Sequence, residues 1–142
     1  MTITPVPPAR HLLRAKDLMD ARYREPLDVP TLAHAAKLSP AHFSREFSRA
    51  FGQTPHQYLL HRRLERAAEL LRNTDRSVAE ICFAVGLASV GSFTTSFGRD
   101  FGVSPTAYRE KFPPASHRAR IPTCVFLAWT RPTTAVLEKT GE

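Results

Sequence analysis

Arginine supplies most of the groups in this chain that could recognise a charged partner. Sixteen of its twenty basic residues are Arg, and against thirteen acidic residues they give a formal net charge of +7. The planar guanidinium donates paired hydrogen bonds to phosphates and to the edge of guanine, so this composition favours nucleic acid as a partner. A coding sequence rich in G and C raises the arginine content in the same way, so charge alone does not establish nucleic acid as the partner.

Two segments expose polar side chains between regularly spaced phenylalanines. In the first, Arg45 can pair with O6 and N7 of guanine, which gives about 1–3 kcal/mol of discrimination, and Arg49 can meet a phosphate. In the second, no Arg, Lys, Asn or Gln stands between Ser89 and Arg99, so bases would be read through thymine methyls, hydroxyl groups and DNA shape. The candidate DNA-binding residues are Ala41, His42, Ser44, Arg45, Arg49, Ser89, Val90, Ser92, Thr94, Thr95 and Arg99.

Other chemistries lack the residues that they need. The sequence has no phosphate-binding glycine loop, no nucleophile elbow, no paired carboxylates and no cluster of histidines, so we expect neither an enzyme nor a bound cofactor or metal. Its two cysteines, Cys82 and Cys124, have no zinc-binding spacing, and Cys82 falls on an apolar helix face as a small buried side chain. A protein-interaction module with a basic surface remains the alternative to a DNA-binding protein.

Short helices must position the candidate residues of the first segment. Asp28 is an N-cap for a helix that ends at Leu38. Ser39-Pro40 then starts a helix with an apolar stripe, and Gly52 ends it. Two short helices joined by a tight turn, with polar residues opposite the stripe of the second, form the pattern of a helix-turn-helix.

Longer helices flank this motif. Apolar periodicity begins near Arg10, and Pro26 stops that helix. A longer helix starts at Thr54-Pro55 and runs to about Asn73 as a spacer. On the spacer we expect Tyr58, Leu60, Leu64, Ala67, Ala68 and Leu71 to face inward, and Arg62, Arg63 and Arg66 to be available outside.

The pattern begins again after the spacer, where Ser77 caps a short helix that Gly86 ends. An offset of fifty residues matches the second apolar stripe to the first, whereas the offset upstream of the turn is forty-nine. A difference confined to the turn is what two copies of one unit would show, each burying its phenylalanines. The matched pairs are Phe43/Phe93, Phe47/Phe97, Phe51/Phe101, Gly52/Gly102, Pro55/Pro105, Tyr58/Tyr108 and Arg49/Arg99.

The most specific segment of the sequence resembles the signature around the second helix-turn-helix of the AraC/XylS family of bacterial transcription regulators. The similarity extends from about His11 to Phe112 and includes the spacer residues Arg63-Leu64, Ala67 and Leu70-Leu71. The residues that carry it are Val85-Gly86-Leu87, Phe93, Phe97, Phe101, Gly102-Val103-Ser104-Pro105 and Tyr108.

This resemblance implies an all-α, homeodomain-like fold of about seven helices, with two helix-turn-helix subdomains joined by a long linker helix. It also implies an asymmetric binding site and activation through contact with RNA polymerase. Arg45 matches a position that the family uses for base contact. Val90, Gly91 and Thr95 depart from the long polar side chains that relatives often carry there, and the chain resembles either a stand-alone member or the DNA-binding half of a longer protein.

We therefore predict a flexible leader over residues 1–9, a tandem helix-turn-helix domain over 10–112 and an irregular tail over 113–142. The domain would consist of a first unit (10–53), a linker helix (54–73) and a second unit (74–112). Recognition helices over about 40–51 and 89–101 would enter successive major grooves of double-stranded DNA, and a monomer could do this. The tail could dock on the second unit, pair with another chain or be disordered. With no membrane segment, we expect a cytoplasmic, nucleoid-associated protein.

Overall fold

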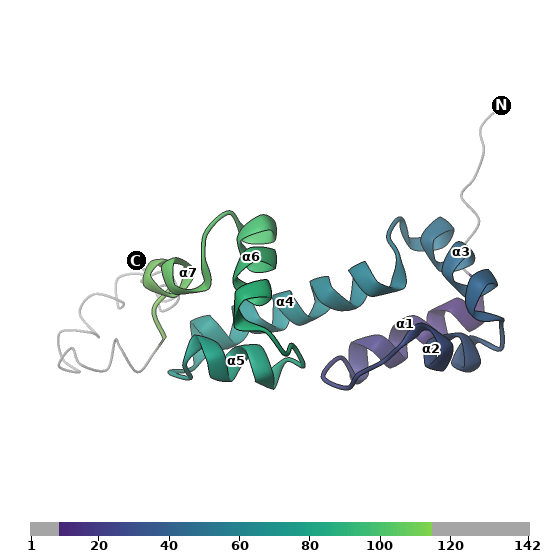
Figure 1. Ribbon diagram of the computed structural model, residues 1–142, viewed down its shortest axis with the longest axis horizontal. Coiled ribbons are helices and arrows are strands. Elements are labelled where there is room, and N and C mark those ends of the chain that lie inside the picture. The colour runs from purple at the N-terminus through teal and green to yellow at the C-terminus, as the bar shows by residue number, and fades with distance from the viewer. Residues whose placement is uncertain (1–8, 115–142) are drawn as a thin grey trace, which may run out of the picture. The chain divides into compact units, whose positions relative to one another are not determined.

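The computed structural model describes residues 9–114, and in this range the chain forms seven α-helices and no strand (Figure 1). The predicted all-α class is confirmed. Apart from Ala9, Pro113 and Pro114, the predicted leader and tail lie outside the described residues. The helices are α1 (Arg10–Ala21), α2 (Val29–Ala36), α3 (Pro40–Phe51), α4 (Pro55–Asn73), α5 (Val78–Ala84), α6 (Val90–Phe101) and α7 (Pro105–Lys111).

The chain divides into two compact units within α4, between Leu64 and Glu65. In the first unit, α1, α2 and α3 pack against one another. In the second unit, α6 packs against both α5 and α7. The helix-turn-helix pairs are α2 with α3 and α5 with α6, so each pair belongs to a single unit.

Side-chain caps begin both helices of the first pair at the predicted residues. Asp28 Oδ1 accepts a hydrogen bond from the Thr31 N–H at 2.9 Å, and Ser39 Oγ accepts one from the His42 N–H at 3.3 Å. The bonds from Thr31 favour the ionised carboxylate, so they lower the pKa of Asp28 below its usual 3.8. Each cap satisfies a backbone donor that the first turn would otherwise leave open.

The second pair is capped by serine at both helix starts. Ser77 Oγ accepts the Glu80 N–H at 3.0 Å while the Glu80 carboxylate accepts the Ser77 N–H at 2.8 Å, which makes a reciprocal capping box. Ser89 Oγ accepts the Ser92 N–H at 3.1 Å, which makes Ser89 the N-cap of α6. These caps fix which side chains the first turn of each helix exposes.

The turn inside each pair needs one residue in the left-handed backbone region. In the first unit this residue is Lys37 at φ 60°, and in the second it is Gly86 at φ 94°. The Leu38 N–H then bonds to the Ala33 carbonyl, and the Leu87 N–H bonds in the same way to the Cys82 carbonyl, both at 3.0 Å. The helices end slightly earlier than predicted because this turn takes up the residues before Leu38 and Gly86.

Each core is built around two phenylalanines one helical turn apart. Phe43 and Phe47 in α3, and Phe93 and Phe97 in α6, are fully buried, whereas the third member of each stripe is half-buried. The ring of Phe47 lies edge-on to Tyr58 at 5.8 Å, and Phe97 meets Tyr108 at 5.3 Å in the same way. Cys82 is also buried, as predicted.

Two details of the longer helices differ from the sequence prediction. α1 ends at Ala21 rather than at Pro26, because residues 22–25 form a turn in which the Glu25 N–H bonds to the Arg22 carbonyl. In α4 it is Leu59, not Leu60, that is buried. The two halves of α4 pack in different units, so a single continuous apolar stripe was the wrong expectation for this helix.

A helix that crosses a bilayer must be both long and apolar. None of the helices in the described part of the chain combines the length and the apolar character needed to cross a membrane.

Candidate nucleic-acid interface

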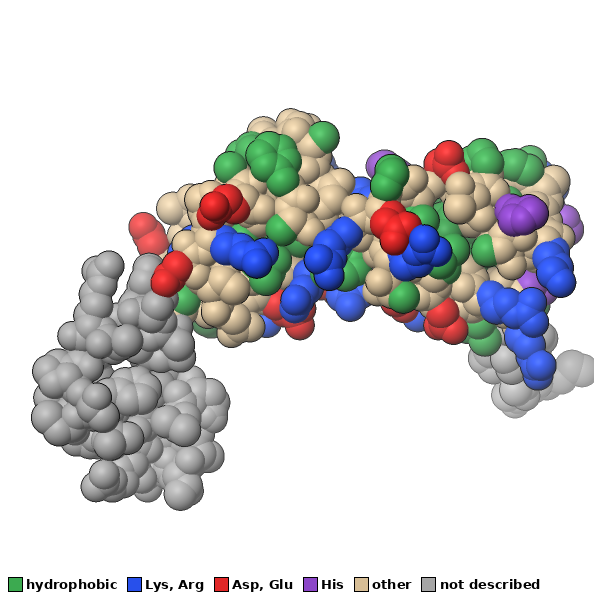
Figure 2. Space-filling model, turned by 90° about the horizontal axis from the view of Figure 1, so that it is seen from below, with side chains coloured by type: hydrophobic (Ala, Val, Ile, Leu, Met, Phe, Trp, Pro, Cys, Tyr) green, Lys and Arg blue, Asp and Glu red, His purple; other side chains and the backbone are tan. Residues whose placement is uncertain are grey.

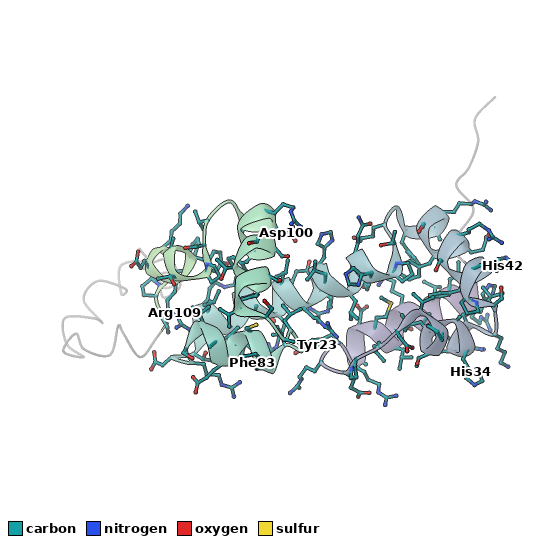
Figure 3. All side chains as sticks on the ribbon, viewed as in Figure 1. Tyr23, His34, His42, Phe83, Asp100 and Arg109 are labelled. Carbon is teal, nitrogen blue, oxygen red and sulfur yellow. The ribbon has the colours of Figure 1, made fainter. Side chains whose placement is uncertain are left out.

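The candidate residues of the first unit lie on the side of α3 opposite its buried phenylalanines. Ala41, His42, Arg45 and Arg49 are exposed, and Ser44 is half-buried at the flank. His42 points away from the core at the edge of the unit (Figure 3). This outward face is the one that a helix docked by its apolar stripe can present to a partner.

The candidate residues of the second unit occupy the equivalent face of α6. Ser92, Thr95 and Arg99 are exposed there, Thr94 is half-buried, and Val90 is half-buried in the first turn behind the exposed cap Ser89. Residues 41–56 have the same burial, position by position, as residues 91–106. The two faces therefore offer the same places to different side chains, with Arg45 in one and Thr95 in the other.

Glu46 is a member of the first face that the sequence prediction missed. Its Oε2 lies 2.9 Å from Nη1 of Arg49 and 3.9 Å from Nε2 of His42. Arg49 remains 74% exposed and His42 50% exposed. Spacings of three and four residues on a helix would have revealed this set, because they place side chains side by side.

The prediction that Arg63 is available on the outside of α4 is wrong. Its Nε donates to the Tyr23 carbonyl at 2.7 Å and its Nη2 to the Glu25 carbonyl at 2.8 Å, so it closes the loop after α1. Burial lowers the pKa of Arg63. In the second unit Arg109 of α7 donates to the Leu71 and Thr74 carbonyls at 3.2 and 3.1 Å.

The neighbouring arginines of α4 are also committed to contacts within the chain. Arg62 lies over the ring of Tyr23 at 5.5 Å and 3.7 Å from Asp20 Oδ1. Arg66 pairs with Glu69 at 3.0 Å. Carbonyl groups, an aromatic ring and carboxylates within the chain bind these guanidinium groups. The arginines of α4 are therefore not unpaired positive charges on its outward side.

Charge is mixed rather than concentrated on the face of the molecule that Figure 2 shows. On the face shown in Figure 2, Lys and Arg side chains are interspersed with Asp and Glu side chains on each unit. Ion pairs account for part of this mixing, among them Arg22 with Glu25 at 2.9 Å and Lys16 with Asp20 at 3.3 Å. No carboxylate of residues 9–114 pairs with the exposed Arg45, so within this range its guanidinium is open to a ligand.

The described residues include no group of His, Cys, Asp and Glu side chains that could hold a metal ion. Burial raises the pKa of the Cys82 thiol, and its Sγ lies 3.7 Å from the Leu87 carbonyl oxygen. A buried thiol with a raised pKa is a packing residue rather than a nucleophile.

Two helix-turn-helix units, each with a capped second helix, define the class of tandem helix-turn-helix proteins. Comparison with known proteins defines the family. A family model described as "Helix-turn-helix domain" matches residues 32–111. A transcriptional regulator structure from Chromobacterium violaceum, described as containing an AraC-type DNA-binding domain, is 31% identical, with a TM-score of 0.68 over 72% of this chain and 92% of that one. The chain belongs to the AraC family of helix-turn-helix proteins, as the sequence resemblance indicated.

Two further relatives carry information about partners. The DNA-binding domain of AdpA, a global transcriptional factor crystallised with a target DNA, is 34% identical, with a TM-score of 0.66 over 82% of this chain and 98% of that one. The transcriptional activator RhaR of Mannheimia succiniciproducens is 41% identical over 76 residues, which are 54% of this chain and 28% of that protein. The proteins that the chain matches are transcription regulators rather than enzymes. It spans only 28–37% of the length of three curated relatives.

Proposed function

We propose that this chain binds double-stranded DNA at specific sequences and regulates transcription there. The observation that carries the proposal is the repeated outward face of α3 and α6, which is set by the same buried phenylalanines and serine caps in both units. A second helix of a helix-turn-helix enters the major groove, so two units allow one chain to read two half-sites. The AdpA domain, bound to its target DNA in the crystal, supports DNA as the ligand.

Within this proposal the two faces have different tasks. Arg45 is exposed on α3 and can reach guanine O6 and N7 with two hydrogen bonds. Thr94, Thr95 and Ser92 on α6 are short, so they read bases by hydroxyl contacts, methyl packing and the shape of the groove. Arg49 and Arg99 lie a turn beyond these positions and are proposed phosphate contacts.

The remaining candidates act at the first turn of each recognition helix. Ala41 offers a methyl group for packing on thymine, and Ser44 and His42 offer single hydrogen bonds. Ser89 and Val90 hold the equivalent place on α6, where Ser89 also serves as the cap. Their contributions are smaller than that of Arg45, because none of them makes a bidentate contact.

The proposed regulatory role is activation. The relative RhaR is named a transcriptional activator. We propose that this chain, bound beside a promoter, activates by contact with RNA polymerase, as the family resemblance implies. We place this activity at the nucleoid in the cytoplasm. A single chain with two units can occupy an asymmetric site of about two helical turns as a monomer, with the recognition helices in successive major grooves.

The test is selection of bound duplexes from a random library at near-physiological salt, followed by fluorescence anisotropy on the selected duplex and on a scrambled one. Salt is held fixed because phosphate contacts make affinity fall steeply with it. We expect at least about a thousandfold preference for the selected duplex, as is typical of specific DNA-binding proteins. Enrichment of no sequence, with weak and uniformly salt-sensitive binding, would refute the proposal and favour a protein-interaction module instead.

A further inference from the structure

The outward face of α3 carries a carboxylate, that of Glu46, beside the proposed phosphate contact Arg49. Glu46 is the acidic residue of α3, and one oxygen of its carboxylate lies 2.9 Å from Nη1 of Arg49 and 3.9 Å from Nε2 of His42. The Glu46 side chain is only 30% exposed, whereas that of Arg49 is 74% exposed. The more buried carboxylate thus holds the more exposed guanidinium.

The second recognition face has no equivalent of this pair. The position matching Glu46 is Ser96, and the position matching His42 is Ser92. Arg99 has the same exposed place on α6 that Arg49 has on α3, but among the described residues no carboxylate pairs with it. Neighbouring Asp100 does not face Arg99, because residues adjacent in a helix point in different directions.

We infer that Glu46 is a positioning residue that weakens the contact of Arg49 with DNA phosphate, so that the first unit contributes less phosphate binding than the second. This inference rests on the proposed function. To contact a phosphate, Arg49 must leave Glu46 or share itself between two anions, and the carboxylate then lies beside the DNA backbone and repels it. Arg99 has neither cost. Glu46 therefore lowers affinity for every DNA sequence and leaves the base contact of Arg45 as the main contribution of α3.

Salt dependence is the property that separates this role from a structural one. Each phosphate contact releases counterions and adds about 0.9 to the slope of log affinity against log salt. Replacing Glu46 by Gln frees Arg49, so we expect the slope to steepen by up to about 0.9. The affinity gain should then shrink about threefold between 50 mM and 200 mM salt.

The experiment measures Kd of the full chain by anisotropy, on the selected and the scrambled duplex, across a salt series. Glu46→Gln should bind both duplexes more tightly than wild type. Arg49→Ala should weaken binding less than Arg99→Ala does, and it should abolish the gain when combined with Glu46→Gln. Thermal unfolding of each variant checks that these substitutions leave the fold intact.

Ser96→Glu supplies the mirror experiment, because it places a carboxylate three residues before Arg99, as Glu46 stands before Arg49. We expect this variant to lose slope by up to about 0.9 and to weaken binding to both duplexes. An unchanged slope in Glu46→Gln, or in Ser96→Glu, would overturn the inference. If wild type prefers no sequence, the proposed function itself fails; if it prefers one and Glu46→Gln binds like wild type, only the inference fails.

Discussion

The two recognition helices, α3 and α6, have matching buried residues and contrasting exposed ones. Both bury two phenylalanines, end at a glycine in the left-handed region and keep the same order of buried and exposed positions. On their outward faces, Arg45, His42 and Glu46 in α3 stand where α6 has Thr95, Ser92 and Ser96. The core thus constrains the buried side of each helix, whereas the residues of the outward side can differ between the two units.

The same contrast extends to the helix that precedes each recognition helix. His34 on α2 and Phe83 on α5 occupy matching places, and both are exposed on the surface of their unit (Figure 3). Phe83 is 58% exposed, so it contributes little to the core of the second unit. This pair, like the outward positions of α3 and α6, is a chemical difference at the surface, which can be altered without loss of the fold.

The largest expected effect tests the shared half of this comparison. Phe47→Ala and Phe97→Ala each remove a fully buried ring, so each should lower the free energy of unfolding by about 3–5 kcal/mol. The exposed Phe83→Ala is the control and should change it by no more than about 0.5 kcal/mol. Urea unfolding followed by circular dichroism measures all three, and a Phe83→Ala loss as large as that of Phe97→Ala would contradict this description of the core.

The next effect tests the contrasting half. Arg45→Ala should weaken binding to the selected duplex by about 1–3 kcal/mol, because it removes a bidentate contact to guanine. Thr95→Ala, the matching substitution in α6, should cost less, because a hydroxyl makes a single contact. Anisotropy at one salt concentration gives both values, and an equal loss in the two variants would show that the faces do not divide the work as proposed.

A smaller effect is expected at the turns, where the residue in the left-handed backbone region is Lys37 in the first unit and Gly86 in the second. Gly86→Ala places a side chain in the left-handed region and should destabilise the chain by about 1–2 kcal/mol. Lys37→Gly removes that strain from the first unit, although glycine adds freedom to the unfolded chain, so a stabilisation of up to about 1 kcal/mol is expected. Urea unfolding at pH 7 checks both signs, and a large loss in Lys37→Gly would contradict the equivalence of the turns.

The smallest expected effect is a pH dependence of stability, which arises at the Asp28 cap of the first unit. The pKa of Asp28 is lowered in the folded chain by the bonds from Thr31, so this cap stabilises the fold above the usual pKa of 3.8. The contribution is lost as the pH falls through the lower folded value. Asp28→Asn keeps an oxygen acceptor but does not titrate, so its Tm should fall less than that of wild type between pH 5 and pH 2. Parallel curves for the two proteins would mean that Asp28 adds no such dependence.

Local signals in the sequence predicted most of the fold. Asp28, Ser39 and Ser77 cap helices as expected, since a cap depends on residues three positions apart. The fifty-residue repeat correctly predicted that two phenylalanines of each stripe are buried, because the same core imposes the same spacing in both units, whereas the third is only half-buried.

Long-range partners could not be predicted in this way. Arg63 and Arg109 both donate to carbonyls at the end of an earlier helix, but they stand at different distances from Pro55 and Pro105, so the repeat does not match them. Nothing local marks Leu59 rather than Leu60 as the buried leucine of α4. The pairing of Glu46 with Arg49 was accessible from their spacing, whereas the DNA contacts of either face depend on a ligand and stay predictions.

The central claim is that the two units read different half-sites through α3 and α6. Repeating the library selection with wild type, Arg45→Ala and Thr95→Ala tests it most directly. The account predicts an asymmetric wild-type motif with two blocks about one helical turn apart, of which Arg45→Ala flattens one and Thr95→Ala affects only the other. A single block, a symmetric motif or the loss of both blocks in Arg45→Ala would contradict it.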